Sequence, residues 1–168
     1  FLSIGSKAAA FAMLLRIFIE GLPAYRLGGL GTLWGQPLGW SGFFYILAIV
    51  TMTLGNIAAL TQGNVKRMLA YSSVAHSGYV LIGVVAGTTR GIGAALVYLM
   101  AYAFMQAGAF AVVASVRRRG VAGGQLKDLA GFYGTHPAAA VAMLLFLLSL
   151  GGLPPTAGFM AKLWVFGA

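Results

Sequence analysis

Residues 150–156 read LGGLPPT and interrupt an apolar run that extends over residues 137–168. Lipid cannot hydrogen-bond the backbone groups that a broken helix frees, so a break within a membrane is tolerated only where it is packed in protein or lines a wet cavity. Lys162 follows the break in apolar sequence, and an ionisable residue at membrane depth indicates function. The stretch therefore predicts a discontinuous transmembrane helix that carries a functional lysine.

The composition places the whole chain in a membrane. Of its 168 residues, 60% are hydrophobic and 8% are charged, whereas soluble domains carry about a quarter charged residues. The formal net charge is +9, but the cations are scattered between apolar spans and do not form the basic face that binds nucleic acid. We therefore expect an all-α, polytopic transmembrane helix bundle with no nucleic-acid partner.

Cysteine is absent, which excludes disulfides, thiolate metal sites and Cys-ligated iron–sulfur clusters from this chain. We accordingly expect no cofactor and no metal here. The chain starts at Phe1 and stops at Ala168 within apolar sequence, and we interpret it as one membrane domain of a longer protein.

Five segments approach the roughly 20 apolar residues that span a bilayer. Between the first two, Gly-rich sequence with Trp34 and Trp40 predicts a loop with interfacial aromatic anchors. The five predicted spans are residues 1–19, 42–60, 68–86, 91–116 and 137–168, the last broken near residues 151–156.

The distribution of cations predicts the orientation, because Lys and Arg in short loops stay in the cytoplasm. The second and fourth connections are the cation-rich ones, and we expect both to be cytoplasmic. Their cations are Lys66, Arg67, Arg117, Arg118, Arg119 and Lys127, against Arg16, Arg26 and Arg90 on the other side.

Two lysines lie inside apolar spans, Lys7 in the first and Lys162 in the last. A lone ammonium in hydrocarbon costs at least about 2.5–3.5 kcal/mol, so each lysine needs a partner, water or a route to an interface. A buried proton-carrying role is one interpretation of both residues. Snorkelling of the long side chain to the nearer membrane surface is the alternative.

His76 lies in the middle of the third span, one turn from Ser73 on one side and from Tyr79 on the other, with Ser72 nearby. Imidazole titrates near neutral pH, which suits a relay between lysines. A buried histidine satisfied by a serine hydroxyl is the alternative. Lys66 opens the same span and is a possible relay on the cytoplasmic side, although topology signals usually explain such a cation.

Four motifs together resemble the antiporter-like membrane subunits of respiratory complex I, and most closely its bacterial subunit N family. The motifs are SKAAAF at residues 6–11, GNIAALTQ at 55–62, KRMLAYSSVAHSGY at 66–79 and SLGGLPPTAGFMAK at 149–162. Sister subunits L and M, and subunits of multisubunit sodium/proton antiporters, share the first three motifs and stay open as alternatives.

The resemblance implies that the five spans correspond to helices eight to twelve of the family. Lys7 then matches the central channel lysine, Lys162 the lysine on the broken helix, and His76 the helix-ten position that supports proton transfer. A glutamate and a further lysine of the family would lie upstream of Phe1.

The resemblance also implies proton translocation in a bacterial inner membrane, as one subunit of an NADH:quinone oxidoreductase. NADH, FMN, iron–sulfur clusters and quinone would then bind to other subunits, and neighbouring antiporter-like subunits would be partners. A sodium/proton antiporter and a purely structural membrane scaffold are the rival functions.

Overall fold

The computed structural model describes residues 2–26, 32–33, 36–37, 39–118 and 124–168. Helices dominate these residues, and a hairpin of two short antiparallel strands lies in the first connection. The elements are α1 Leu2–Leu15, the π-helix Arg16–Gly21, the 3-10 turn Pro23–Tyr25, β1 Thr32–Leu33, β2 Gln36–Pro37, α2 Trp40–Leu60, α3 Val65–Ala86, α4 Thr89–Arg118, the 3-10 turn Leu126–Leu129, α5 Phe132–Thr135, α6 Pro137–Gly151 and α7 Ala157–Phe166.

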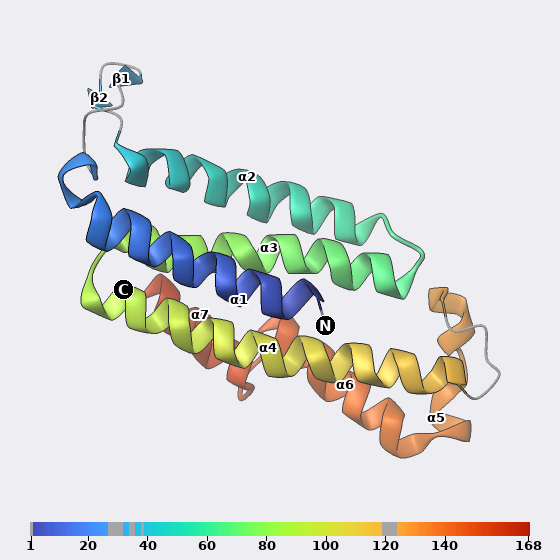
Figure 1. Cartoon of the computed structure of the whole chain (residues 1–168). Helices are drawn as coiled ribbons and strands as arrows, with labels where there is room; N and C mark the ends of the chain where they lie inside the picture. Colours follow the sequence, from blue (N-terminus) through green and yellow to red (C-terminus); the bar gives the residue numbers. More distant parts are fainter. Residues whose placement is uncertain (1, 27–31, 34–35, 38, 119–123) are drawn as a thin grey trace.

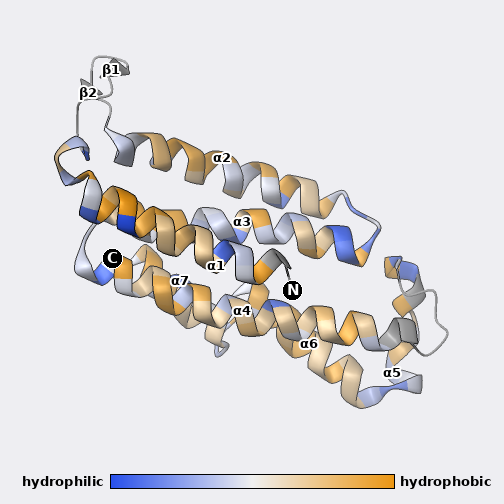
Figure 2. Ribbon diagram, in the orientation of Figure 1, coloured by the Kyte–Doolittle hydropathy of each residue, from blue (hydrophilic) through white to orange (hydrophobic). Residues whose placement is uncertain are grey.

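The helices form a bundle around α3 and α4 (Figure 1). α2 packs along α3, α3 packs along α4, and α1 contacts both α3 and α4. The two halves of the C-terminal span, α6 and α7, both pack on α4, and α7 also contacts α3. Figure 2 shows hydrophobic residues along all the long helices. The predicted all-α membrane bundle is confirmed.

Helices α2, α3 and α4 are long and apolar enough to cross a membrane, and α6 and α7 are shorter apolar helices. The first predicted span is not one regular helix, because α1 gives way to π-helix at Arg16. On α3, the Asn64 side chain caps the N-terminus by accepting from the Lys66 and Arg67 amides at 3.0 and 3.3 Å. Gly87, at φ 56°, ends the helix.

The predicted discontinuity lies between α6 and α7. α6 ends at Gly151 and is capped by Gly152, whose φ of 81° suits glycine, and Thr156 precedes α7. Ser149 ties the two halves together, because its buried hydroxyl accepts a hydrogen bond from the Gly158 amide at 3.1 Å. The two ends of the break are thus packed together, whereas most of the residues between them, 151–157, are exposed on this chain.

The two cation-rich connections lie at the same end of the bundle (Figure 1). They are hydrogen-bonded to each other, from the Val65 amide to the Gly124 carbonyl at 3.1 Å and from the Leu126 amide to the Gly63 carbonyl at 2.9 Å. Arg119 lies outside the described residues. This arrangement agrees with the expectation that both connections face one side of the membrane.

The prediction of interfacial tryptophans is wrong for Trp40. This side chain is buried, its Nε1 donates to the Leu22 carbonyl at 2.9 Å, and its ring packs against Phe18 and Phe44. A tryptophan at a helix start can pack inward as well as sit in the headgroup region. Trp34 lies outside the described residues.

Gly55 allows α2 to approach α3 closely. A Cβ atom there would lie 2.7 Å from the Ala75 amide nitrogen, which belongs to rigid helix backbone. Small residues at such crossings are how membrane helices gain close packing.

We predict that Gly55→Ala lowers the stability of the intact protein by about 1–3 kcal/mol, because α2 must move away from α3. Gly93→Ala is the matched control, since a Cβ there meets nothing within 4 Å, and alanine favours helix by up to about 1 kcal/mol. Thermal unfolding in detergent would measure both variants. An unchanged midpoint for Gly55→Ala would show that the α2–α3 contact is looser than described.

Candidate functional site

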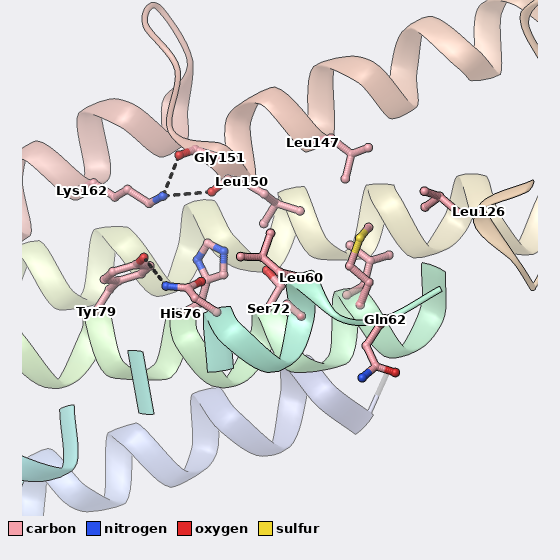
Figure 3. A pocket seen from close by; sticks show the side chains of 14 residues that line it. Leu60, Gln62, Ser72, His76, Tyr79, Leu126, Leu147, Leu150, Gly151 and Lys162 are labelled. Carbon is pink, nitrogen blue, oxygen red and sulfur yellow. Dashed lines mark hydrogen bonds between the residues drawn. The ribbon is translucent and has the colours of Figure 1, made fainter. Parts of the chain in front are cut away.

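Lys162 lies on α7 and turns back toward the end of α6 (Figure 3). Its Nζ donates to the carbonyl oxygens of Leu150 and Gly151, both at 3.0 Å. The last carbonyls of a helix lack intrahelical partners and carry the negative end of the helix dipole. Lys162 therefore satisfies the backbone that the break exposes, and the snorkelling alternative is wrong for this residue.

Lys162 also faces the third span. Its Nζ lies 5.0 Å from the centre of the Tyr79 ring, within the range of a cation–π contact. The Tyr79 ring in turn lies 5.5 Å from the His76 ring in an edge-on arrangement. The lysine of the broken helix thus reaches His76 through one aromatic side chain.

His76 is buried between α3 and α4. Its Nδ1 lies 2.5 Å from the Tyr98 hydroxyl, and one of these two groups donates while the other accepts. The Tyr98 and Tyr102 rings lie 5.9 and 5.0 Å from the imidazole. The alternative that a serine hydroxyl satisfies this histidine is wrong, since a tyrosine of α4 does so.

Lys7 reaches the same region from α1. Its Nζ donates to the Ser73 carbonyl of α3 and lies 5.8 Å from the centre of the Tyr102 ring. The Ser77 hydroxyl donates to the same carbonyl at 3.0 Å. Lys7 therefore points into the bundle, where a backbone oxygen and an aromatic ring hold its ammonium group.

The structure brings together three of the four predicted site residues. Lys7, His76 and Lys162 are linked by two tyrosines, in the order Lys7, Tyr102, His76, Tyr79, Lys162. Neighbouring groups in this order lie 5.0–5.8 Å apart by the distances above. We call these five residues the lysine–tyrosine path.

Lys66 lies apart from this path. It is in the first turn of α3, ten residues before His76, or about 15 Å along the helix. Its side chain does not line the cavity beside His76. Lys66 is thus a cation at the start of a helix, and its role as a proton relay stays a prediction.

Sequence analysis missed the polar side chains of α4. Tyr98, Tyr102 and Gln106 recur every four residues in an apolar helix, and this spacing places them on one face. This spacing in the sequence is the signal that could have identified them. Asn56 on α2 was also missed, and its amide lies 3.5 Å from the Tyr79 hydroxyl.

A cavity of about 480 Å³ lies beside the path, between α3 and α6. Figure 3 shows Lys162, Tyr79 and His76 toward one end and Gln62 and Leu126 toward the other. Gln62 and Leu126 belong to the two cation-rich connections. The polar residues that line the cavity are Asn56, Gln62, Ser72, His76, Tyr79 and Lys162.

The chemistry of the site is basic and aromatic. Among the described residues, no three His, Asp or Glu side chains gather as a metal ion would require. Lysine, imidazole and phenol groups at this spacing can instead hold and exchange protons, since all three bear transferable protons.

Comparison with known proteins places these features in a family. Residues 32–168 match the model described as NADH:quinone oxidoreductase/Mrp antiporter, TM. The chain is 48% identical over 166 residues to NADH-quinone oxidoreductase subunit N 2 of Solibacter usitatus, covering 99% of this chain and 31% of that protein. It is 45% identical to subunit N of Trichlorobacter lovleyi, covering 99% and 32% of the two chains.

A third relative, subunit N of Coxiella burnetii, is 42% identical over 168 residues, which cover all of this chain and 33% of that protein. The chain thus spans about a third of the length of the curated relatives it matches.

We predict that the cavity is hydrated. Ser72 lies about 10 Å along α3 from Val65 and lines the cavity, so the thiol of Ser72→Cys should ionise and react with a membrane-impermeant thiol reagent added from the side of the cation-rich connections. Thiolates form in wet or positively charged surroundings and not in apolar ones.

Leu54→Cys is the control, because Leu54 is exposed on the apolar surface of α2 and does not line the cavity. Both cysteines would be introduced into intact protein otherwise free of cysteine, in oriented membrane vesicles. Reaction of Leu54→Cys alone, or of Ser72→Cys from the opposite side alone, would exclude this access route.

Proposed function

Because the chain belongs to the NADH:quinone oxidoreductase/Mrp antiporter transmembrane family, we propose that it moves protons across a bacterial inner membrane as part of subunit N of NADH-quinone oxidoreductase. Its relatives named as that subunit match nearly all of this chain. The observation that carries the proposal is the lysine–tyrosine path, which joins two intramembrane lysines through one histidine.

In the proposed mechanism, Lys7 holds a proton near the middle of the membrane. His76 receives this proton and passes it toward Lys162, with the intervening tyrosine hydroxyls and bound water as carriers. Three basic groups so close together repel each other when all are charged. Protonation at one end of the path therefore favours release at the other end.

The partners of the two lysines suit this cycle. Lys7 donates to the Ser73 carbonyl, and Lys162 donates to the Leu150 and Gly151 carbonyls. Backbone carbonyls are neutral, so a lysine that loses its proton leaves no buried countercharge behind. A carboxylate partner would instead remain as an unpaired buried charge, which is strongly unfavourable.

The energy for this transport would come from quinone reduction in other subunits, which would hold NADH, FMN, iron–sulfur clusters and quinone. Neighbouring antiporter-like subunits would flank this one in the membrane. The cation-rich end of the bundle would face the cytoplasm, and the cavity that reaches Gln62 would give water access from there.

A sodium/proton antiporter is the second candidate, because the description of the matching family covers both classes. The two differ in their partners: flavin and iron–sulfur subunits would copurify with a complex I subunit but not with an antiporter. A structural scaffold is the third candidate, and it requires that neither lysine matters for transport.

We predict that Lys7→Ala in the intact complex lowers NADH-driven proton pumping by about tenfold, because a positioned proton-transfer group contributes at least that much. Arg16→Ala is the control, since Arg16 continues the same helix but is exposed. Pumping would be measured as acidification of inverted vesicles, alongside NADH oxidation. Full pumping at full turnover in Lys7→Ala would remove the central step of the proposal.

A further inference from the structure

Helix α4 carries a third polar side chain, Gln106, beyond the two tyrosines that contact His76. Tyr98, Tyr102 and Gln106 are 0%, 3% and 0% exposed, and their four-residue spacing aligns them on the face that packs against α3. The tyrosines belong to the surroundings of His76, whereas the lysine–tyrosine path does not use Gln106.

Gln106 is half satisfied. Its Nε2 donates to the Leu69 carbonyl of α3 at 3.1 Å, which fixes the plane of the amide. Its Oε1 is buried and has no hydrogen-bond partner among the described residues. The Tyr102 hydroxyl is also buried and makes no hydrogen bond of normal length there, although the Ser73 side chain lies near it. Buried polar atoms are nearly always paired, and ordered water pairs those that protein groups leave over.

Gln106 and Tyr102 lie in the same part of the bundle as Lys7. Gln106 donates to the Leu69 carbonyl, and Lys7 donates to the Ser73 carbonyl one turn further along α3, a separation of about 6 Å along the helix. Tyr102 lies one turn from Gln106, and its ring lies 5.8 Å from the Lys7 ammonium. Leu69 is nearer than Ser73 to the start of α3, so Gln106 lies on the side of Lys7 toward the cation-rich end.

We propose that the Gln106 Oε1 and the Tyr102 hydroxyl bind a buried water molecule beside Lys7, and that Gln106 positions this water to deliver protons to Lys7. The proposal rests on the proposed function. Gln106 acts as a positioning residue, because its amide holds the water and does not itself titrate.

The proton transfer balances as follows. One O–H bond of the water breaks as an N–H bond forms on the neutral amine of Lys7. The water gains a replacement proton from the aqueous phase at the cation-rich end, through further water, and so is regenerated. The Gln106 Oε1 accepts a hydrogen bond from one O–H of this water. The other O–H is then free to transfer its proton to Lys7, and an oxygen lone pair of the water can accept the replacement proton.

The test uses the intact complex with Gln106→Met and Gln106→Asn. Methionine has a similar length but no strong hydrogen-bonding group, so we expect proton pumping to fall by about tenfold at normal assembly. Asparagine is uncharged and keeps both the amide oxygen that accepts from the water and the N–H groups, on a side chain one methylene shorter. We expect Gln106→Asn to retain clearly more pumping than Gln106→Met. A role in packing alone would not separate the two variants in this way.

Lys7→Ala, measured in the same assay as the Gln106 variants, distinguishes failure of the water site from failure of the proposed function. Loss of pumping in Lys7→Ala with full pumping in Gln106→Met would overturn the water site and leave the proposed function standing. Full pumping in Lys7→Ala would overturn the function itself. Equal losses in Gln106→Met and Gln106→Asn would also overturn the positioning role.

A high-resolution electron cryomicroscopy map of the unaltered complex decides the matter if Gln106→Met fails to assemble. We expect density for a water molecule about 2.7–3.2 Å from both the Gln106 Oε1 and the Tyr102 hydroxyl. Ordered side chains without such density would overturn the proposal.

Discussion

The bond between Lys162 and the end of α6 is the interaction on which the site depends. A helix that stops inside a membrane exposes carbonyl groups that lipid cannot satisfy. The Lys162 ammonium satisfies two of them, on Leu150 and Gly151, and this contact also holds the lysine against Tyr79. The break and the intramembrane charge, each unfavourable alone, therefore stabilise each other and place a proton carrier next to α3.

A cationic side chain also donates to the last carbonyl groups of α3, but there the cation is an arginine. The Arg26 guanidinium donates to the carbonyls of Val85 and Ala86 at 3.2 and 2.5 Å. Arginine keeps its proton in proteins, so this contact is a permanent cap. Lysine can lose its proton, and Lys162 and Lys7 both bind carbonyl oxygens. The choice of cation thus separates a structural helix end from one that can take part in proton transfer.

Much of the fold followed from the sequence. The apolar spans, the break after Gly151 and the positions of Lys7, His76 and Lys162 are local features that length, glycine, proline and charge reveal. The direction of the Lys162 side chain could not be predicted, because nearly all of its neighbours in the sequence are apolar and helical periodicity then marks no buried face. The burial of Trp40 was missed because it depends on Phe18, which comes from the preceding span, as well as on Phe44 one turn along the same helix.

The central claim is that Lys7 and Lys162 act on one proton path through His76. Residues that act as a unit give non-additive losses. Proton pumping by the intact complex, measured in vesicles for Lys7→Ala, Lys162→Met and the double variant, tests the claim most directly. We expect each single variant to lose proton pumping by about tenfold. We expect the double variant to pump no less than the single variant with the lower activity. Full pumping by Lys162→Met, or losses that multiply in the double variant, would contradict it.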